Sequence, residues 1–130
     1  MNLKKSALPI SLMLALLPII GHAAACTRAD FTGTWRIYFP EGNSAGRCTL
    51  IMPKTGTTIS TSSSCYLPGV VTSTPLRGNL TLFTDCHVTG TVTEGGQKST
   101  IDAYISRGKD SISGMGWSGL EGGPFSGVRQ

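Results

Sequence analysis

The sequence predicts an all-β fold: a small antiparallel meander β-barrel of about eight strands, stapled by disulfides. Three observations support this prediction. Short runs in which apolar and polar residues alternate recur about every ten residues. Turn-forming residues separate most of these runs. After residue 26, no run shows the apolar spacing of an amphipathic helix.

Residues 1–25 have the organisation of a cleavable signal peptide. Lys4 and Lys5 form a basic head, residues 7–20 are an uncharged apolar run, and residues 23–25 are the small-residue pattern that a signal peptidase cuts. The apolar run is shorter than the roughly twenty residues that a membrane-spanning helix needs. We therefore expect cleavage and export, with no membrane span.

The remaining residues, 26–130, should form a single domain in the periplasm or outside the cell. Two of the eleven Lys and Arg residues belong to the leader, so the domain has only a small basic excess over seven Asp and Glu residues. No basic stripe is visible, and we expect no nucleic-acid partner. We also expect no cofactor and no metal, because the cysteines lack metal-ligand spacing and His87 is the only histidine after cleavage.

Four cysteines follow the cleavage site and predict two disulfides. Of the three possible connectivities we favour Cys48–Cys65, worth about 3 kcal/mol in the chain-entropy model, and Cys26–Cys86, worth about 4 kcal/mol. A lipid anchor on Cys26 is the alternative. Lipidation would leave one thiol unpaired, and no Leu stands three residues before Cys26, so the disulfide is favoured.

The first half of the domain contains four β-like runs. In residues 34–39 and 48–52, apolar residues occupy every second position. Residues 57–62 are polar and β-prone, and residues 66–72 contain Pro68, which indicates an edge or bent strand.

The second half contains five more runs, and the same alternation defines most of them. They are residues 79–83, 87–93, 100–106, 112–117 and 125–129. Glycines inside them are interpreted as bends or bulges of a small barrel.

Turn-rich segments separate the runs, at residues 40–43, 54–56, 94–96, 107–110 and 121–124. Most are the length of hairpin loops, which supports a meander. Several carboxylates lie in these turns, and we expect them to be solvated rather than paired for catalysis.

Gly33-Thr34-Trp35, at the start of the first run, resembles the opening motif of lipocalin-like (calycin) barrels. In that family the Trp closes the barrel floor and an Arg near the last strand packs across it. The resemblance implies these structural roles for Trp35 and Arg129. A guanidinium over an indole gains roughly 0.5–2 kcal/mol.

The layout of Trp35, Cys48, Leu50 and Cys65 is also similar to that of small periplasmic inhibitors of secreted metalloproteases, which are eight-stranded barrels. That family usually carries one disulfide, whereas this chain predicts two. The resemblance implies an alternative function, inhibition of a secreted or periplasmic hydrolase.

The candidate contact site lies between two aromatic residues near the end of the chain. Trp117, Leu120 and Phe125 flank a Gly-rich loop, and aromatic residues in loops often anchor partners. His87 is expected on the polar face of its strand, and no Gly-x-Ser-x-Gly elbow accompanies it. We therefore assign no catalytic residues.

The leading functional expectation is a non-enzymatic exported binding protein. It would contact a protein partner or a small apolar ligand through the loops at one barrel end. In a chain this short we expect side chains to fill the interior, which favours the protein partner.

Overall fold

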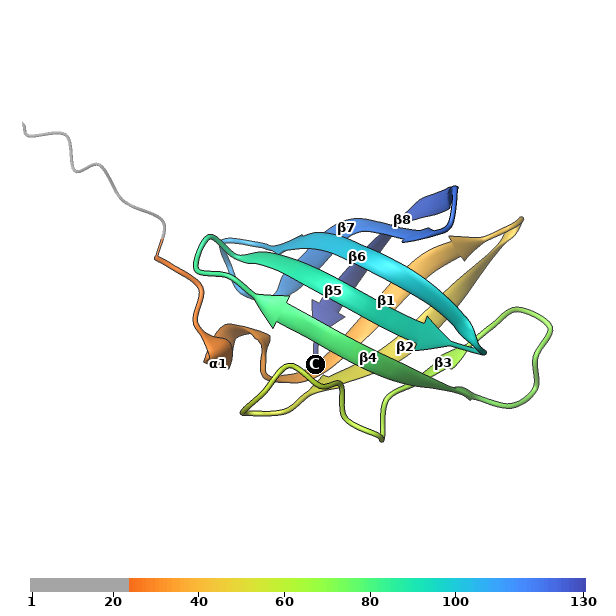
Figure 1. Cartoon of the computed structure of the whole chain (residues 1–130), viewed down its shortest axis with the longest axis horizontal. Coiled ribbons are helices and arrows are strands. Elements are labelled where there is room, and N and C mark those ends of the chain that lie inside the picture. Colours follow the sequence, from red (N-terminus) through yellow and green to blue (C-terminus); the bar gives the residue numbers. More distant parts are fainter. Residues whose placement is uncertain (1–23) are drawn as a thin grey trace, which may run out of the picture.

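A computed structural model describes residues 24–130, so nearly all of the predicted signal peptide lies outside the described residues. The chain forms a closed barrel of eight antiparallel strands, arranged in sequence order (Figure 1). Disulfides join Cys26 to Cys86 and Cys48 to Cys65. The predicted all-β meander barrel and both disulfide pairings are therefore confirmed.

One short helix precedes the strands. In chain order the elements are α1 (Arg28–Phe31), β1 (Gly33–Glu41), β2 (Ser44–Met52), β3 (Ser64–Tyr66), β4 (Thr74–Leu82), β5 (His87–Glu94), β6 (Gln97–Ile105), β7 (Ser111–Ser118) and β8 (Glu121–Arg129). Among the described residues, no helix is long and apolar enough to cross a membrane.

Two of the expected strands differ from the structure. Residues 57–62 form no strand, and only an isolated bridge joins Thr58 to Asn79. The run expected over residues 66–72 contributes only Tyr66 to β3, and the rest is a loop leading to β4. Pro68 and Gly69 explain the early end, because proline cannot donate to a β ladder and Gly69 has a positive φ of 77°.

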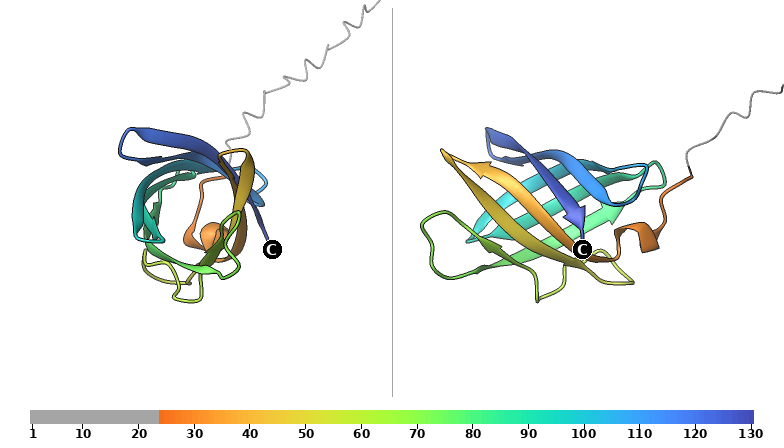
Figure 2. Two further views of the ribbon diagram at one scale, coloured as in Figure 1. Left: turned by 90° about the vertical axis from the view of Figure 1, so that its right-hand side faces the viewer. Right: turned by 180° about the vertical axis from the view of Figure 1, so that it is seen from behind.

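The meander divides the loops between the two ends of the barrel. The β1–β2, β3–β4, β5–β6 and β7–β8 connections share one end, which we call the mouth. The chain enters and leaves at the other end, which we call the floor. Seen along the barrel from the mouth, the strands form a ring with α1 at the far end (Figure 2).

Large buried side chains fill the floor. Phe31 and Trp35 are fully buried, and their rings lie 6.0 Å apart between centroids. Met52 and Ile59 are buried beside them in the same core cluster. The loop that contains Ile59 thus contributes to the core although it is not a strand.

The seam between β1 and β8 is only partly paired. Pairing runs from Trp35 opposite Arg129 to Tyr38 opposite Ser126, whereas β1 continues to pair with β2 as far as Glu41. Beyond the last paired residues, toward the mouth, the β1–β2 and β7–β8 hairpin tips diverge (Figures 1 and 2).

The unpaired part of each seam strand contains a proline. Pro40 lies in β1 and Pro124 in β8, and neither has an N–H to leave unpaired. Proline at an open edge also blocks pairing with another chain, so these residues protect the seam.

Candidate binding cavity

The barrel is hollow above its floor. A cavity of about 800 Å³ extends from the mouth down to Cys48, Cys65 and Val88. Binding sites for small molecules usually have about 300–1,000 Å³, so this volume suits a ligand of that size. The expectation that side chains would fill the interior is therefore wrong.

Apolar side chains from seven strands form the wall of the cavity. They are Ile37, Phe39, Leu50, Leu76, Leu80, Val88, Val92, Ile101, Ile112 and Phe125. Each lies at an inward position of its strand, as strict alternation requires.

Small residues at inward positions explain why the upper barrel is empty. On β7 the inward Gly116 and Ser118 line the cavity, and Ser99 and Gly123 do so on β6 and β8. A Cβ added to Gly116 would come within 3.3 Å of the Ile101 side chain, so even a methyl group would enter the lumen. The sequence predicts a bend at Gly116 and a turn at Gly123, whereas in the structure both lie in strands and leave space for the cavity.

Three glutamates lie around the mouth of the cavity. Glu41 ends β1, Glu94 ends β5 and Glu121 begins β8, and all three line the cavity. None of the described residues that line it is Lys, Arg or His. The cavity thus has an apolar wall and an acidic rim.

Glu94 is the least solvated of these carboxylates. Burial raises the pKa of its carboxyl group, and the charge of Glu41 raises it further. Its Oε1 atom is out of contact with solvent and has no hydrogen-bond partner among residues 24–130. The expectation that the turn carboxylates are simply solvated is wrong for Glu94.

The three predicted contact residues take different positions in the β7–β8 hairpin. Phe125 points inward and lines the cavity. Leu120 lies fully exposed at the hairpin turn, on the rim. Trp117 faces outward, where a Cβ on the cross-strand Gly122 would collide with its indole. The structure therefore does not bring the three side chains together.

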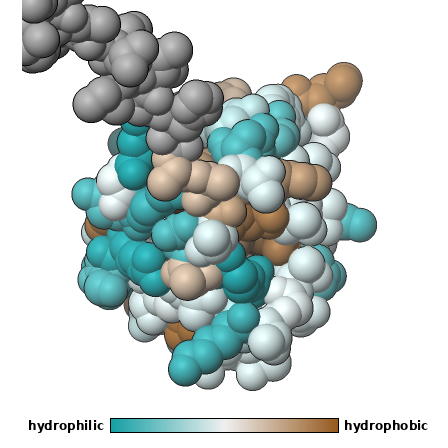
Figure 3. All heavy atoms as spheres, turned by 90° about the vertical axis from the view of Figure 1, so that its left-hand side faces the viewer, coloured by the Kyte–Doolittle hydropathy of each residue, from teal (hydrophilic) through white to brown (hydrophobic). Residues whose placement is uncertain are grey.

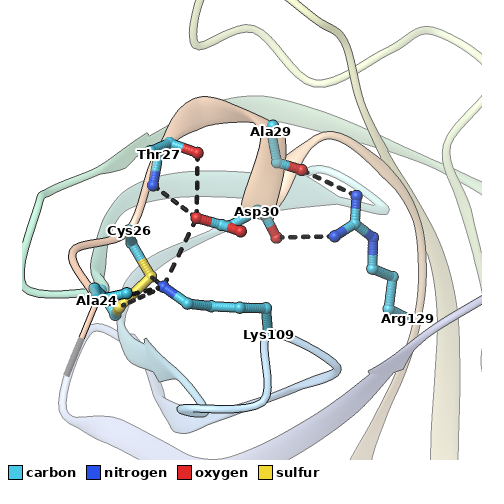
Figure 4. Close-up of polar contacts among 8 residues, drawn as sticks. Ala24, Cys26, Thr27, Ala29, Asp30, Lys109 and Arg129 are labelled. Atoms are coloured by element: carbon cyan, nitrogen blue, oxygen red, sulfur yellow. Dashed lines mark hydrogen bonds and ion pairs between the residues drawn. A yellow bond between two sulfur atoms is a disulfide. The ribbon is translucent and has the colours of Figure 1, made fainter. Parts of the chain in front are cut away.

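Trp35 and Arg129 meet at the floor. The Arg129 guanidinium carbon lies 5.9 Å from the centroid of the Trp35 ring. Its Nη2 donates to the carbonyl oxygen of Ala29 at 2.9 Å, and Nη1 donates to that of Asp30 at 3.5 Å (Figure 4). Nη2 also donates to the carbonyl oxygen of Thr32 at 2.7 Å. Arg129 thus ties β8 to α1 and to the residue after it.

Lys109 holds the other side of α1. Its Nζ lies 3.6 Å from Asp30 Oδ2 and 2.8 Å from Cys26 Sγ, beside the Cys26–Cys86 disulfide (Figure 4). The backbone N–H of Thr27 donates to Asp30 Oδ2 at 2.7 Å, and this bond is the main cause that lowers the pKa of Asp30. Figure 3 views this end of the molecule, where hydrophilic and intermediate side chains surround a few apolar ones.

His87 lies on the outer wall, as expected. Its Nε2 is 2.7 Å from Asp102 Oδ1, and its ring stacks on Tyr104 with 4.6 Å between centroids. Within residues 24–130, no group of three or more His, Cys, Asp or Glu side chains is placed to hold a metal ion.

The sequence contains a signal for the acidic rim. The dipeptide Glu-Gly occurs at Glu41, Glu94 and Glu121, each time where a strand meets a hairpin turn. In an up-and-down meander, alternate connections lie at the same end of the barrel. Counting connections would have placed all three glutamates together.

The comparisons with known proteins give no relative from which a function could be carried over. No protein-family description, curated protein or solved structure matches this chain. The geometry of the cavity is therefore the basis for assigning a function.

Proposed function

We propose that this chain is an exported, non-enzymatic binding protein that holds a small, mainly apolar ligand inside its barrel. The observation that carries the proposal is the cavity of about 800 Å³, to which seven strands contribute apolar side chains. Burying apolar ligand surface contributes roughly 25 cal/mol per Å², so such a wall can supply most of the affinity. Phe31 and Trp35 close the floor, so a ligand would enter through the mouth.

The test is titration with a neutral apolar fluorescent probe, N-phenyl-1-naphthylamine. The wild-type chain should enhance its fluorescence saturably, and Gly116→Leu should abolish the enhancement by filling the lumen. Ser113→Leu adds the same side chain at an outward, exposed position of β7 and is the matched control. Equal binding by both variants, or no binding by the wild type, would refute the proposal.

A protein partner at the mouth is the second candidate function. Leu120 at the β7–β8 turn and Val71 in the β3–β4 loop are both essentially fully exposed, and both loops lie at the mouth. Val71 is not among the residues that line the cavity, so Val71→Ser should weaken capture of such a partner and leave probe binding intact. Loss of probe binding with retained capture would contradict this division of roles.

The alternative of hydrolase inhibition rests on the layout of four residues. Trp35, Cys48, Leu50 and Cys65 are all buried in the barrel core, where they support the scaffold. They are not placed to touch an enzyme, so inhibition remains a proposal carried by the resemblance alone. A panel of secreted proteases assayed with micromolar protein tests it.

A further inference from the structure

All the glutamates of this chain lie in one place. The chain contains Glu41, Glu94 and Glu121, and each lines the mouth of the cavity. The aspartates lie elsewhere: Asp30, Asp85 and Asp110 near the floor, and Asp102 on the outer wall. The mouth is therefore acidic although the chain as a whole has an excess of basic residues.

Within residues 24–130, no Lys, Arg or His side chain lines this rim. The register neighbours of Glu94 are Leu76 on β4 and Gln97 on β6, and neither is charged. The charged group that acts on Glu94 is a second carboxylate, Glu41. The adjacent Lys98 is exposed and is not among the residues that line the cavity.

Glu94 has an unmet need for a hydrogen-bond donor. Its Oε1 is shielded from solvent and has no partner in the described part of the chain. An unpaired carboxylate oxygen in such a position is costly. Glu94 lines the cavity, so a rotation of its carboxyl group toward a donor on a bound molecule would remove that cost. A cation would do so best, because a charge-assisted hydrogen bond is about twice as strong as a neutral one.

We propose that the ligand of the barrel is a cationic amphiphile, with an apolar body in the cavity and a protonated amine at Glu94, Glu41 and Glu121. This inference rests on the proposed function and specifies its ligand class. The apolar wall alone would accept neutral, anionic and cationic molecules of the same length. The rim discriminates among them, because three carboxylates would repel an anionic head group and would pair with a cationic one.

The test compares three ligands that share one decyl chain: 1-aminodecane, 1-decanol and decanoate. Each displaces N-phenyl-1-naphthylamine from the wild-type protein near neutral pH and at low ionic strength. The amine should bind at least about tenfold more tightly than the alcohol, and the carboxylate should bind most weakly. Raising the salt concentration should reduce the difference in affinity between the amine and the alcohol, because salt screens the charge interaction.

Glu94→Gln should remove most of the preference for the amine while decanol binding stays within about twofold. Asp102→Asn removes the same charge from the outer wall and should leave the preference unchanged. Glu41→Gln and Glu121→Gln, at exposed rim positions, test the same point if Glu94→Gln does not fold.

The outcomes separate the two proposals. If none of the three decyl compounds displaces the probe and the probe itself does not bind, the proposed function fails. If the alcohol binds as tightly as the amine, or decanoate binds best, the cavity holds apolar ligands but the cationic class is wrong. Retention of the full amine preference in the three rim variants would also overturn it.

Discussion

Glu41 and Glu94 come from different hairpins, yet they lie close enough at the barrel mouth for the charge of Glu41 to raise the pKa of Glu94. Burial is the larger cause of that rise. Each carboxylate opposes the ionisation of the other, so this pair does not stabilise the folded barrel by itself. A bound cation between them, as we propose, would remove the repulsion.

Glu94 should make the folded protein relatively more stable in acid. Its pKa is higher in the folded state than in the unfolded chain, so its stabilising contribution is complete below the unfolded value of about 4.3 and is lost as the pH rises through the folded value. Glu94→Gln should therefore raise the free energy of unfolding near pH 7. Urea unfolding at several pH values measures the difference, which should shrink toward about pH 4. A pH-independent difference would contradict this assignment.

Arg129 should stabilise the floor through the hydrogen bonds that its planar guanidinium group donates, and not through its charge alone. Arg129→Leu removes three hydrogen bonds to carbonyl oxygens and the contact with Trp35, and should cost about 2 kcal/mol. Arg129→Lys should recover less than half of that, since an ammonium cannot reach several carbonyls in a plane. Urea unfolding followed by circular dichroism measures both.

The matched control for Arg129 is Arg107→Leu, which removes the same charge from an exposed turn. It should change the free energy of unfolding by less than about 0.5 kcal/mol. Equal losses for the two leucine variants would mean that Arg129 acts only through net charge.

Gly90 should tolerate no side chain. It has a positive φ of 152°, and a Cβ there would collide with the carbonyl oxygen of Asn79 on β4. Gly90→Ala should cost at least about 2 kcal/mol, from overpacking and backbone strain together. Gly123→Ala is the control, because the nearest atom to its added Cβ is 3.9 Å away. Thermal unfolding should separate the two, and comparable melting temperatures would refute the collision.

The Cys26–Cys86 disulfide should contribute more to stability than Cys48–Cys65. The first links cysteines that are 60 residues apart in sequence, and the second links cysteines that are 17 residues apart. Replacing each pair by alanine should cost about 4 and about 3 kcal/mol respectively. Urea unfolding of the two double variants gives the order. A reversed order would show that packing of the buried Cys48 and Cys65 outweighs chain entropy.

Local patterns were sufficient to predict the scaffold. Alternation around Trp35, Leu80 and Ile112 defines strands because side chains in a strand alternate between two faces. The number of cysteines, together with the predicted export, predicts the two disulfides. The prediction of a strand over residues 57–62 was wrong. β-branched residues favour strands on average. Here the path of the backbone is set instead by Ile59, which is buried in the core, and by Ser63, whose hydroxyl accepts a hydrogen bond from the Ile51 N–H.

The cavity and its rim could not be read from local pattern. Whether Gly116 bends its strand or leaves space for a cavity depends on which side chains lie opposite it across the barrel. Those side chains come from other strands, so the sequence of β7 alone does not predict the outcome. Trp117 shows the same limit, since an aromatic beside glycines suggests a contact site, but the pleat of β7 turns it to the outer wall.

The partial pairing of β1 with β8 makes closure of the barrel uneven along its height. The diameter of a closed barrel is fixed by its strand number and stagger. Between β1 and β8 the register covers only four pairs, from Trp35 opposite Arg129 to Tyr38 opposite Ser126. Backbone hydrogen bonds therefore close the ring near the floor. Nearer the mouth the two strands meet through side chains such as Pro40, which lies beside Gly123.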